Sequence, residues 1–203
     1  MSGNGATIEF IARKYETDPV TGGLTFDENG NITNSVVWED PKIATGENKN
    51  VILDYGATAV LCNIFGMAGS ATWQFMAYGA SSTAATHTQA QLIYELTADG
   101  TRPKLTNVGG TPLSNAAITL TTFTDNTYTP GYSYFRQAAV LGTVLNTTLN
   151  AGQPVSEIAI NSAQACPATP FASSGVYLDR YVFGSPTVLD GVTTLAITIL
   201  LHF

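Results

Sequence analysis

The two histidines, His87 and His202, are the side chains of this chain best suited to acid–base catalysis or to binding a metal. A zinc site needs further ligands at defined spacings, and the sequence contains neither an H-x-x-x-H pair nor a C-x-x-C pair. A Ser-His-Asp triad can be assembled from distant residues, but the G-x-S-x-G motif that often carries its serine does not occur. We therefore predict no catalytic residues and no metal site, and we expect a protein that is not an enzyme.

Two acidic clusters could bind a cation or act on a sugar, and turns account for both of them better. Residues 27–31 resemble a calcium loop, but their glycine comes too early and Trp38 stands where the closing glutamate belongs. Glu39 and Asp40 directly precede Pro41 in a predicted turn, whereas a glycosidase needs two carboxylates facing each other across a cleft. A phosphate loop of the G-x-x-x-x-G-K-[ST] kind is also absent. The sequence therefore predicts no cofactor.

Four aromatic residues lie close together in the chain and could stack on a sugar ring: Tyr128, Tyr132, Tyr134 and Phe135. Aromatic side chains of this kind more often pack against their own sheet or against a neighbouring subunit. A carbohydrate-binding module therefore remains an alternative.

Charged residues make up only 11% of the 203 residues, and the net charge is −7. Globular proteins usually have about a quarter of charged residues. A surface with so few charges is typical of a protein that neighbours cover in an assembly; a secreted or low-charge monomer is the alternative. The eight Lys and Arg residues are spread along the chain, so we expect no nucleic-acid surface.

The sequence shows neither a signal peptide nor an apolar run long enough to span a bilayer, so we expect no membrane partner. Cys62 and Cys166 do not amount to a disulfide framework. We expect two unpaired, buried thiols in a protein made in a reducing cytoplasm; a single disulfide between them is the alternative.

One short helix is predicted over residues 86–98. Thr86 and Gln89 form a T-x-x-Q capping box, and Leu92 and Leu96 follow at helical spacing. Residues 55–62 fit a strand or a short helix, and we favour the strand.

The rest of the chain reads as many short strands separated by Gly, Pro and Asn turns, which predicts a mainly β protein with an antiparallel, jelly-roll-like β-sandwich. The last run alternates so regularly that we expect it in the middle of a sheet. After the first fifty residues, the predicted strands cover residues 51–53, 73–78, 101–107, 116–124, 133–141, 155–160, 176–183 and 194–203.

Residues 1–50 differ from the remainder. They contain brief strands at residues 7–12 and 36–38, a hairpin around Asn29-Gly30, and few residues that could fill a core of their own. We predict an extended N-terminal arm or a small β addition over residues 1–50, followed by a β-sandwich domain over residues 51–203.

From residue 50 onward, the order of motifs resembles that of small structural proteins of tailed bacteriophages. Similar proteins have a strand with an A-x-G turn, a small-residue loop, a short helix, and then three strands that carry a glutamate, an arginine and a final glycine. The matching residues here are 50–56, 75–85, 91–96, 157–161, 175–183 and 189–195. The group often has glycine in the glutamate strand, where this chain has Ala159, and residues 1–50 match nothing in it.

The resemblance implies a virion protein without catalysis. It favours a capsid decoration or cement protein that binds the major capsid protein, or other virion proteins, on the outer shell and stabilises it through contacts between subunits. The phage precedent favours a homotrimer, made in the host cytoplasm and located on the virion. A tail, collar or fibre-anchor component is the alternative within the same group.

Overall fold

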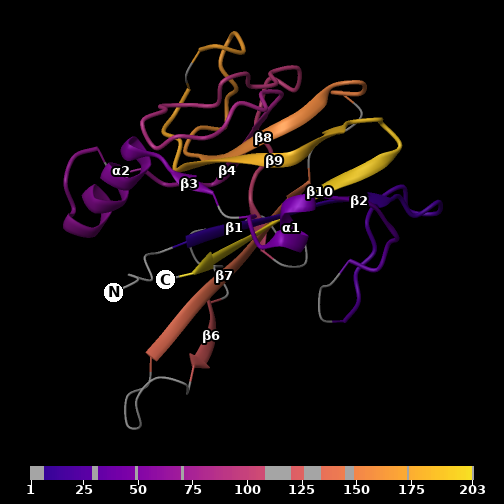
Figure 1. Ribbon diagram of the computed structural model, residues 1–203, viewed down its shortest axis with the longest axis horizontal. Helices are drawn as coiled ribbons and strands as arrows, with labels where there is room; N and C mark the ends of the chain where they lie inside the picture. Colours follow the sequence, from indigo (N-terminus) through magenta and orange to yellow (C-terminus); the bar gives the residue numbers. More distant parts are fainter. Residues whose placement is uncertain are drawn as a thin grey trace.

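The computed structural model describes residues 7–28, 32–48, 50–69, 71–107, 120–125, 134–144, 149–172 and 174–202. In this part of the chain the protein is mainly β, with two antiparallel sheets and two helices (Figure 1). The strands are β1 (Thr7–Glu16), β2 (Val36–Glu39), β3 (Val51–Ile52), β4 (Phe75–Gly79), β5 (Thr106–Asn107), β6 (Leu120–Asp125), β7 (Tyr134–Val144), β8 (Pro154–Asn161), β9 (Asp179–Val188) and β10 (Thr193–His202); the helices are α1 (Pro41–Thr45) and α2 (Asp54–Phe65).

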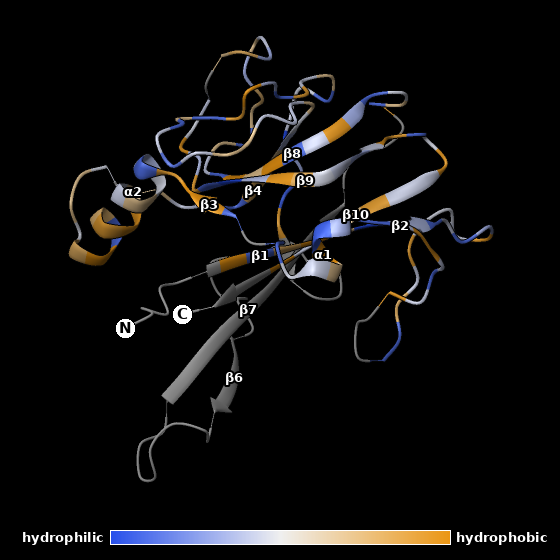
Figure 2. Ribbon diagram, viewed as in Figure 1, coloured by the Kyte–Doolittle hydropathy of each residue, from blue (hydrophilic) through white to orange (hydrophobic). Residues whose placement is uncertain are grey.

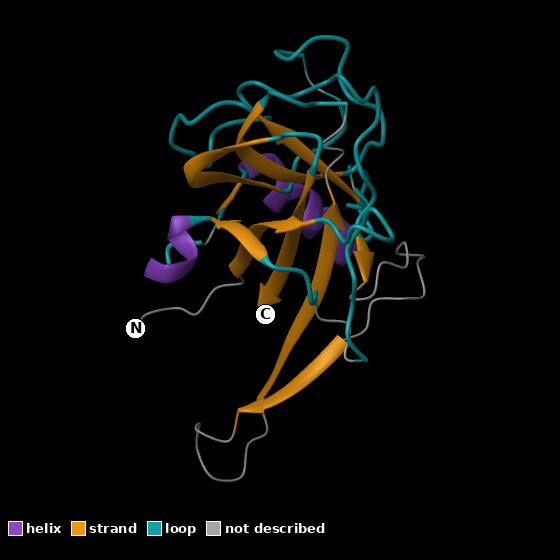
Figure 3. Ribbon diagram, turned by 90° about the vertical axis from the view of Figure 1, so that its right-hand side faces the viewer, coloured by secondary structure: helices purple, strands orange, loops and turns teal. Residues whose placement is uncertain are grey.

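The six-stranded sheet has the order β2-β1-β10-β7, and both β5 and β6 pair with the far edge of β7. β10 lies between β1 and β7, so the prediction that the last strand occupies the middle of a sheet is confirmed. β7 pairs with β10 only from Ala138 onward, so its first residues and β6 extend beyond the sheet as a two-stranded ribbon (Figures 1 and 3).

An extended N-terminal arm is not confirmed. β1 pairs with β10 over ten residues, from Thr7 opposite His202 to Glu16 opposite Thr193. Its alternate residues Ile8, Phe10 and Ala12 are buried in the same core as strands from the second half of the chain. Residues 1–6 lie outside the described residues.

The second sheet has four strands in the order β3-β9-β8-β4. The main core contains side chains of both sheets, so it lies between them. Its largest contributors come from β1, β4, β8, β9 and β10: Phe10, Met76, Tyr78, Ile158, Ile160, Tyr181, Phe183, Leu195, Ile197 and Ile199. A jelly-roll connectivity is not confirmed by these strand orders.

Long loops cover the other face of the four-stranded sheet (Figure 3). Ala77 of β4 and Ala159 of β8 point to that face and pack against Leu92 and Tyr177 of the loops and against Leu53. The small alanines let the loops approach the sheet closely, which creates a second, smaller core. The chain between β4 and β5 therefore adds a layer of loops where the sequence had predicted a helix.

The predicted helix over residues 86–98 is wrong, because this segment pairs with the edge of β4 instead. Ala80 donates its backbone N–H to Tyr94 O at 2.9 Å, and Leu96 donates to Tyr78 O at the same distance. The preference for a strand over residues 55–62 is also wrong, since these residues form most of α2. The helix therefore lies at residues 54–65, where a strand was predicted, and residues 86–98, where a helix was predicted, form a loop beside β4.

Other boundaries differ less. The predicted strand 101–107 shrinks to β5, and residues 116–119 of the next one lie outside the described part. β9 begins three residues later than predicted and continues through Gly184 and Pro186, where a turn was expected. Within this continuation, the Asp40 carboxylate accepts the backbone N–H of Gly184 at 2.9 Å.

Candidate interaction surface

The charged and polar side chains of the loop layer form hydrogen bonds with one another. Arg102 donates to both carboxylate oxygens of Glu95, at 2.7 and 3.0 Å, and both side chains are almost fully buried. The Tyr177 hydroxyl donates to Glu95 at 2.5 Å, and Arg102 also reaches Asn161 at 3.0 Å. Burial alone would lower the pKa of Arg102, but the hydrogen bond and charge of Glu95 outweigh it and raise that pKa. This cluster joins the two covering loops to β8 and is structural.

A second buried ion pair fixes the other end of the same loop. Arg180 of β9 donates to Glu157 of β8 at 2.6 Å, and neither side chain is exposed. The Glu157 carboxylate also accepts the backbone N–H of Tyr94 at 2.8 Å, while Arg180 donates to Thr83 O at 2.8 Å and to Gln89 at 3.0 Å. These hydrogen bonds join three loop residues to side chains of β8 and β9, so the pair anchors the loop to the sheet.

Three buried tyrosine hydroxyls donate to carboxylates in the same way. Tyr78 donates to Asp99, Tyr177 to Glu95, and Tyr181 to Asp40. Burial, followed by the nearby carboxylates, raises the pKa of all three hydroxyls, so they stay protonated and remain donors at neutral pH. None of them is activated as a base or nucleophile.

Among the buried carboxylates of the described ranges, Asp179 has the fewest hydrogen bonds to offset its burial. It accepts the backbone N–H of Ile160 at 2.7 Å and the amide of Asn50 at 2.5 Å, and neither partner carries a charge. Burial raises the pKa of Asp179 to about 7, against the lowering effect of these two hydrogen bonds. Its ionisation therefore affects stability at neutral pH.

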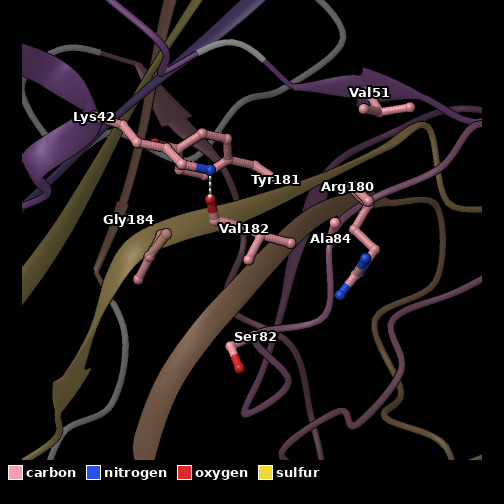
Figure 4. A pocket seen from close by; sticks show the side chains of 10 residues that line it. Lys42, Val51, Ser82, Ala84, Arg180, Tyr181, Val182 and Gly184 are labelled. Atoms are coloured by element: carbon pink, nitrogen blue, oxygen red, sulfur yellow. Dashed lines mark hydrogen bonds between the residues drawn. The ribbon is translucent and has the colours of Figure 1, made fainter. Parts of the chain in front are cut away.

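A groove of about 360 Å³ lies beside β9 (Figure 4). Lys42 of α1 donates its ammonium to Val182 O at 2.6 Å and stands 5.3 Å from the Tyr181 ring centroid. The other cation of the groove, Arg180, is committed to Glu157. The lining residues include the Ser82 hydroxyl but no carboxylate, histidine or cysteine, so no carboxylate or imidazole base lines the groove beside that hydroxyl.

The structure separates the histidines singled out in the sequence. His87 lies in a loop with its side chain 68% exposed, and its Nδ1 is 3.1 Å from the carboxylate of Asp54 at the start of α2. His202 lies in β10, and its side chain is not described. Within the described ranges, no three His, Cys, Asp or Glu side chains gather into a cluster that could hold a metal.

The remaining candidates have structural roles or lie outside the described part. Phe26 and Ile32 form an antiparallel bridge, so the hairpin interpretation of residues 27–31 is confirmed, although residues 29–31 themselves are not described. Glu39 pairs with Arg13 at 2.5 Å, and Asp40 caps α1. Of the aromatic cluster, residues 128 and 132 lie outside the described residues, and residues 134 and 135 lie in β7 with side chains that are not described.

Cys62 and Cys166 are both free and half-buried, so the prediction of unpaired thiols is confirmed. Burial, followed by the charge of Glu95, raises the pKa of Cys166 to about 11. The Cys166 thiol is therefore not prepared for nucleophilic chemistry, because the reactive form of cysteine is the thiolate.

Helix α2 has its small residues inside and its large ones outside. Only Gly56 and Ala59 are buried, and a Cβ added to Gly56 would stand 2.2 Å from the backbone oxygen of Leu178. Leu61, Ile64 and Phe65 are 54%, 67% and 71% exposed. Figure 2 shows this hydrophobic stretch on a helix at one side of the molecule. A helix that served only its own fold would turn its large apolar face inward.

Two neighbouring side chains extend the exposed patch, and residues 55–67 themselves contribute no charge to it. Tyr55 is 67% exposed and Met67 is 59% exposed, and the chain has no charged residue between Asp54 and Met67. We call the exposed side of residues 55–67 the α2 surface. Exposed apolar patches of this kind mark sites where other molecules bind.

The helix itself was readable from local signals that the alternating pattern obscured. Asp54 supplies a negative charge in the first turn, and Gly66 ends the helix in the left-handed conformation at φ 63°. The orientation of the helix could not be predicted, because Gly56 meets Leu178 only in the folded structure.

Comparison of the chain with family models, with curated proteins and with solved structures finds no match. In the described part of the chain, neither helix is long and apolar enough to cross a membrane. The resemblance to phage structural proteins therefore remains a prediction.

Proposed function

We propose that this chain is a structural protein of a tailed-phage virion without enzymatic activity, and that it decorates the outer surface of the capsid as a cement protein. The observation that carries the proposal is the α2 surface, which exposes large apolar side chains to water. This exposure is unfavourable, and a protein that covers the side chains removes it. The low charged fraction of 11% and the order of motifs from residue 50 onward support the same assignment.

The proposed mechanism is burial of surface across subunit boundaries. A protein that binds only the assembled shell stabilises it by mass action, because dissociation of the shell must also release the bound protein. The partners are the major capsid protein, other virion proteins and further copies of this chain. We also propose that the two sheets pack as a β-sandwich, since one buried cluster contains side chains of both.

The buried charges support a role without catalysis. Glu95, Glu157 and Asp40 each accept hydrogen bonds from buried groups of the protein, and the groove beside β9 has no carboxylate in its lining. An N-terminal clamping arm would have been further support, but β1 belongs to the six-stranded sheet, so the proposal rests on the α2 surface instead.

Particles of the encoding phage, made with and without this protein, test the proposal. We expect the protein at a copy number comparable to that of the major capsid protein, and we expect purified protein added to deficient particles to raise the temperature at which they release their genome. A copy number that is a small fraction of the capsid protein would place it in the tail, collar or fibre anchor. Its absence from purified particles would refute the virion assignment.

A further inference from the structure

We propose that the occupant of the α2 surface is a second copy of this chain, bound about a two-fold axis with the two α2 helices antiparallel. This inference rests on the proposed role of that surface as an assembly contact and names its partner. It depends on how side-chain size changes along the helix.

After Asp54, the face of α2 opposite the buried Gly56 and Ala59 has small side chains in its first half and large ones in its second. Ala57 and Thr58 are exposed in the first half, whereas Leu61, Ile64 and Phe65 are exposed in the second. Residues three, four and seven apart share a face of a helix, so these five positions form one stripe.

An antiparallel two-fold pair matches these two halves. With Leu61 opposite Leu61 of the second copy, Ile64 and Phe65 of each helix lie over Ala57 and Thr58 of the other. Large side chains then fill the space above small ones, as in knobs-into-holes packing. A two-fold contact uses the same patch on both copies, so the stripe has to complement itself, and it does.

The polar groups of the helix do not oppose burial. The Thr58 hydroxyl already donates to Asp54 O at 2.8 Å, and the Asn63 amide donates to Ala71 O at 2.7 Å. Each therefore keeps a partner when water is removed, which avoids the cost of an unsatisfied donor. The protein carries a net charge of −7, but the helix after Asp54 is uncharged, so a second copy brings no like charges together across the stripe.

The available area can support a dimer. At about 200 Å² for each large side chain, the exposed parts of Leu61, Ile64 and Phe65, with Met67 just beyond the helix, amount to roughly 500 Å² per copy. Stable interfaces bury about 800 Å² per partner, so these side chains supply more than half of that area, and the exposed Ala57 and Thr58 add to it.

Sedimentation of the purified full chain over about 1 to 100 μM, the range for an interface of this size, tests the pairing. We expect a dimer, and we expect Leu61→Asp to weaken it about a hundredfold or more, because it places two carboxylates near the axis. The matched control is Val20→Asp, which adds the same charge at a residue 90% exposed outside α2 and should leave the dimer intact. A monomeric wild-type protein, or a dimer unaffected by Leu61→Asp, would overturn the inference.

Disulfide cross-linking in a Cys62→Ser, Cys166→Ser background tests the orientation. A mixture of the Thr58→Cys and Ile64→Cys proteins should give a mixed cross-linked dimer, and Leu61→Cys should cross-link with itself. Efficient self-linking of Thr58→Cys without the mixed product would indicate parallel helices and contradict the proposal.

These outcomes separate the inference from the proposed function. A monomer in solution that is still abundant on virions would remove the second copy as occupant and leave the decoration role standing. A dimer that is absent from virions would support the second copy as occupant and refute the decoration role. The resemblance favours a trimer, and the stoichiometry from sedimentation distinguishes it from a two-fold pair.

Discussion

Replacing Asp179 with asparagine should make the protein more stable at neutral and alkaline pH. The carboxylate is fully buried, and among the described residues it accepts hydrogen bonds from Ile160 N–H and the Asn50 amide, neither of which is charged. An asparagine at position 179 keeps an oxygen for Ile160, and the Asn50 amide can rotate to present its own oxygen to the new NH₂ group. The substitution therefore removes a buried charge while preserving the hydrogen bonds.

The size of the effect follows from the pKa of Asp179, which burial raises from 3.8 to about 7. The folded protein binds this proton more tightly than the unfolded chain, so the wild-type stability falls as the pH rises from about 4 to about 7, and the loss is complete above that range. A shift of about 3 units corresponds to about 4 kcal/mol of unfolding free energy, taken as an upper estimate.

Urea unfolding of wild-type protein and Asp179→Asn at about pH 4.5 and about pH 8 measures this difference. We expect similar stabilities at the lower pH and an advantage of about 2–4 kcal/mol for the variant at the higher pH. Asp190→Asn is the control with the opposite sign: although burial opposes it, hydrogen bonds from Lys14 and Thr193 hold the pKa of Asp190 well below its usual range. Above about pH 4, the Asp190→Asn variant should therefore be less stable than the wild-type protein. An equal difference between Asp179→Asn and wild type at both pH values would refute the reasoning.

Three further predictions concern the groups that hold α2 and the loop layer. Gly56→Ala should lower the unfolding free energy by about 2 kcal/mol or more, because its Cβ meets a backbone oxygen at 2.2 Å, whereas Gly23→Ala, with open space around it, should change urea unfolding little. Glu95→Gln should cost about 3–5 kcal/mol in the same assay, because it leaves a buried guanidinium without its counter-charge; a loss below about 1 kcal/mol would contradict the buried pair. In a Cys62→Ser protein, the rate at which Cys166 reacts with a thiol reagent should keep rising up to about pH 11, and a plateau near neutral pH would be inconsistent with its raised pKa.

The strands that the sequence predicted best are those with two different, fully covered faces. β8 alternates between Ile158 and Ile160, which enter the main core, and Glu157 and Ala159, which face the loop layer. β10 has a long apolar set because Leu195, Ile197 and Ile199 all enter the main core. Period-two patterns survive in such strands because a shift of one residue would exchange the two faces.

The exchanged helix assignment shows what local patterns could not reveal. Half of the predicted capping box does form, since Thr86 donates its backbone N–H to Gln89 Oε1 at 3.0 Å. The helix does not follow, because the open edge of β4 offers backbone partners to Tyr94 and Leu96, and Leu92 has a place in the second core. The residues that make these competing contacts lie outside the segment 86–98, so the sequence of the segment itself cannot predict them.

The α2 surface was the part of the candidate site least open to prediction from sequence, and the buried charges explain why it stands out in the structure. The chain has few charged residues, and two buried ion pairs that fix the loop layer to the four-stranded sheet contain four of them: Glu95, Arg102, Glu157 and Arg180. These four charges are therefore not on the surface, where charged side chains normally keep protein molecules from associating through apolar patches. A chain with this distribution gains stability when its exposed helix is covered, which is the property that an assembling protein requires.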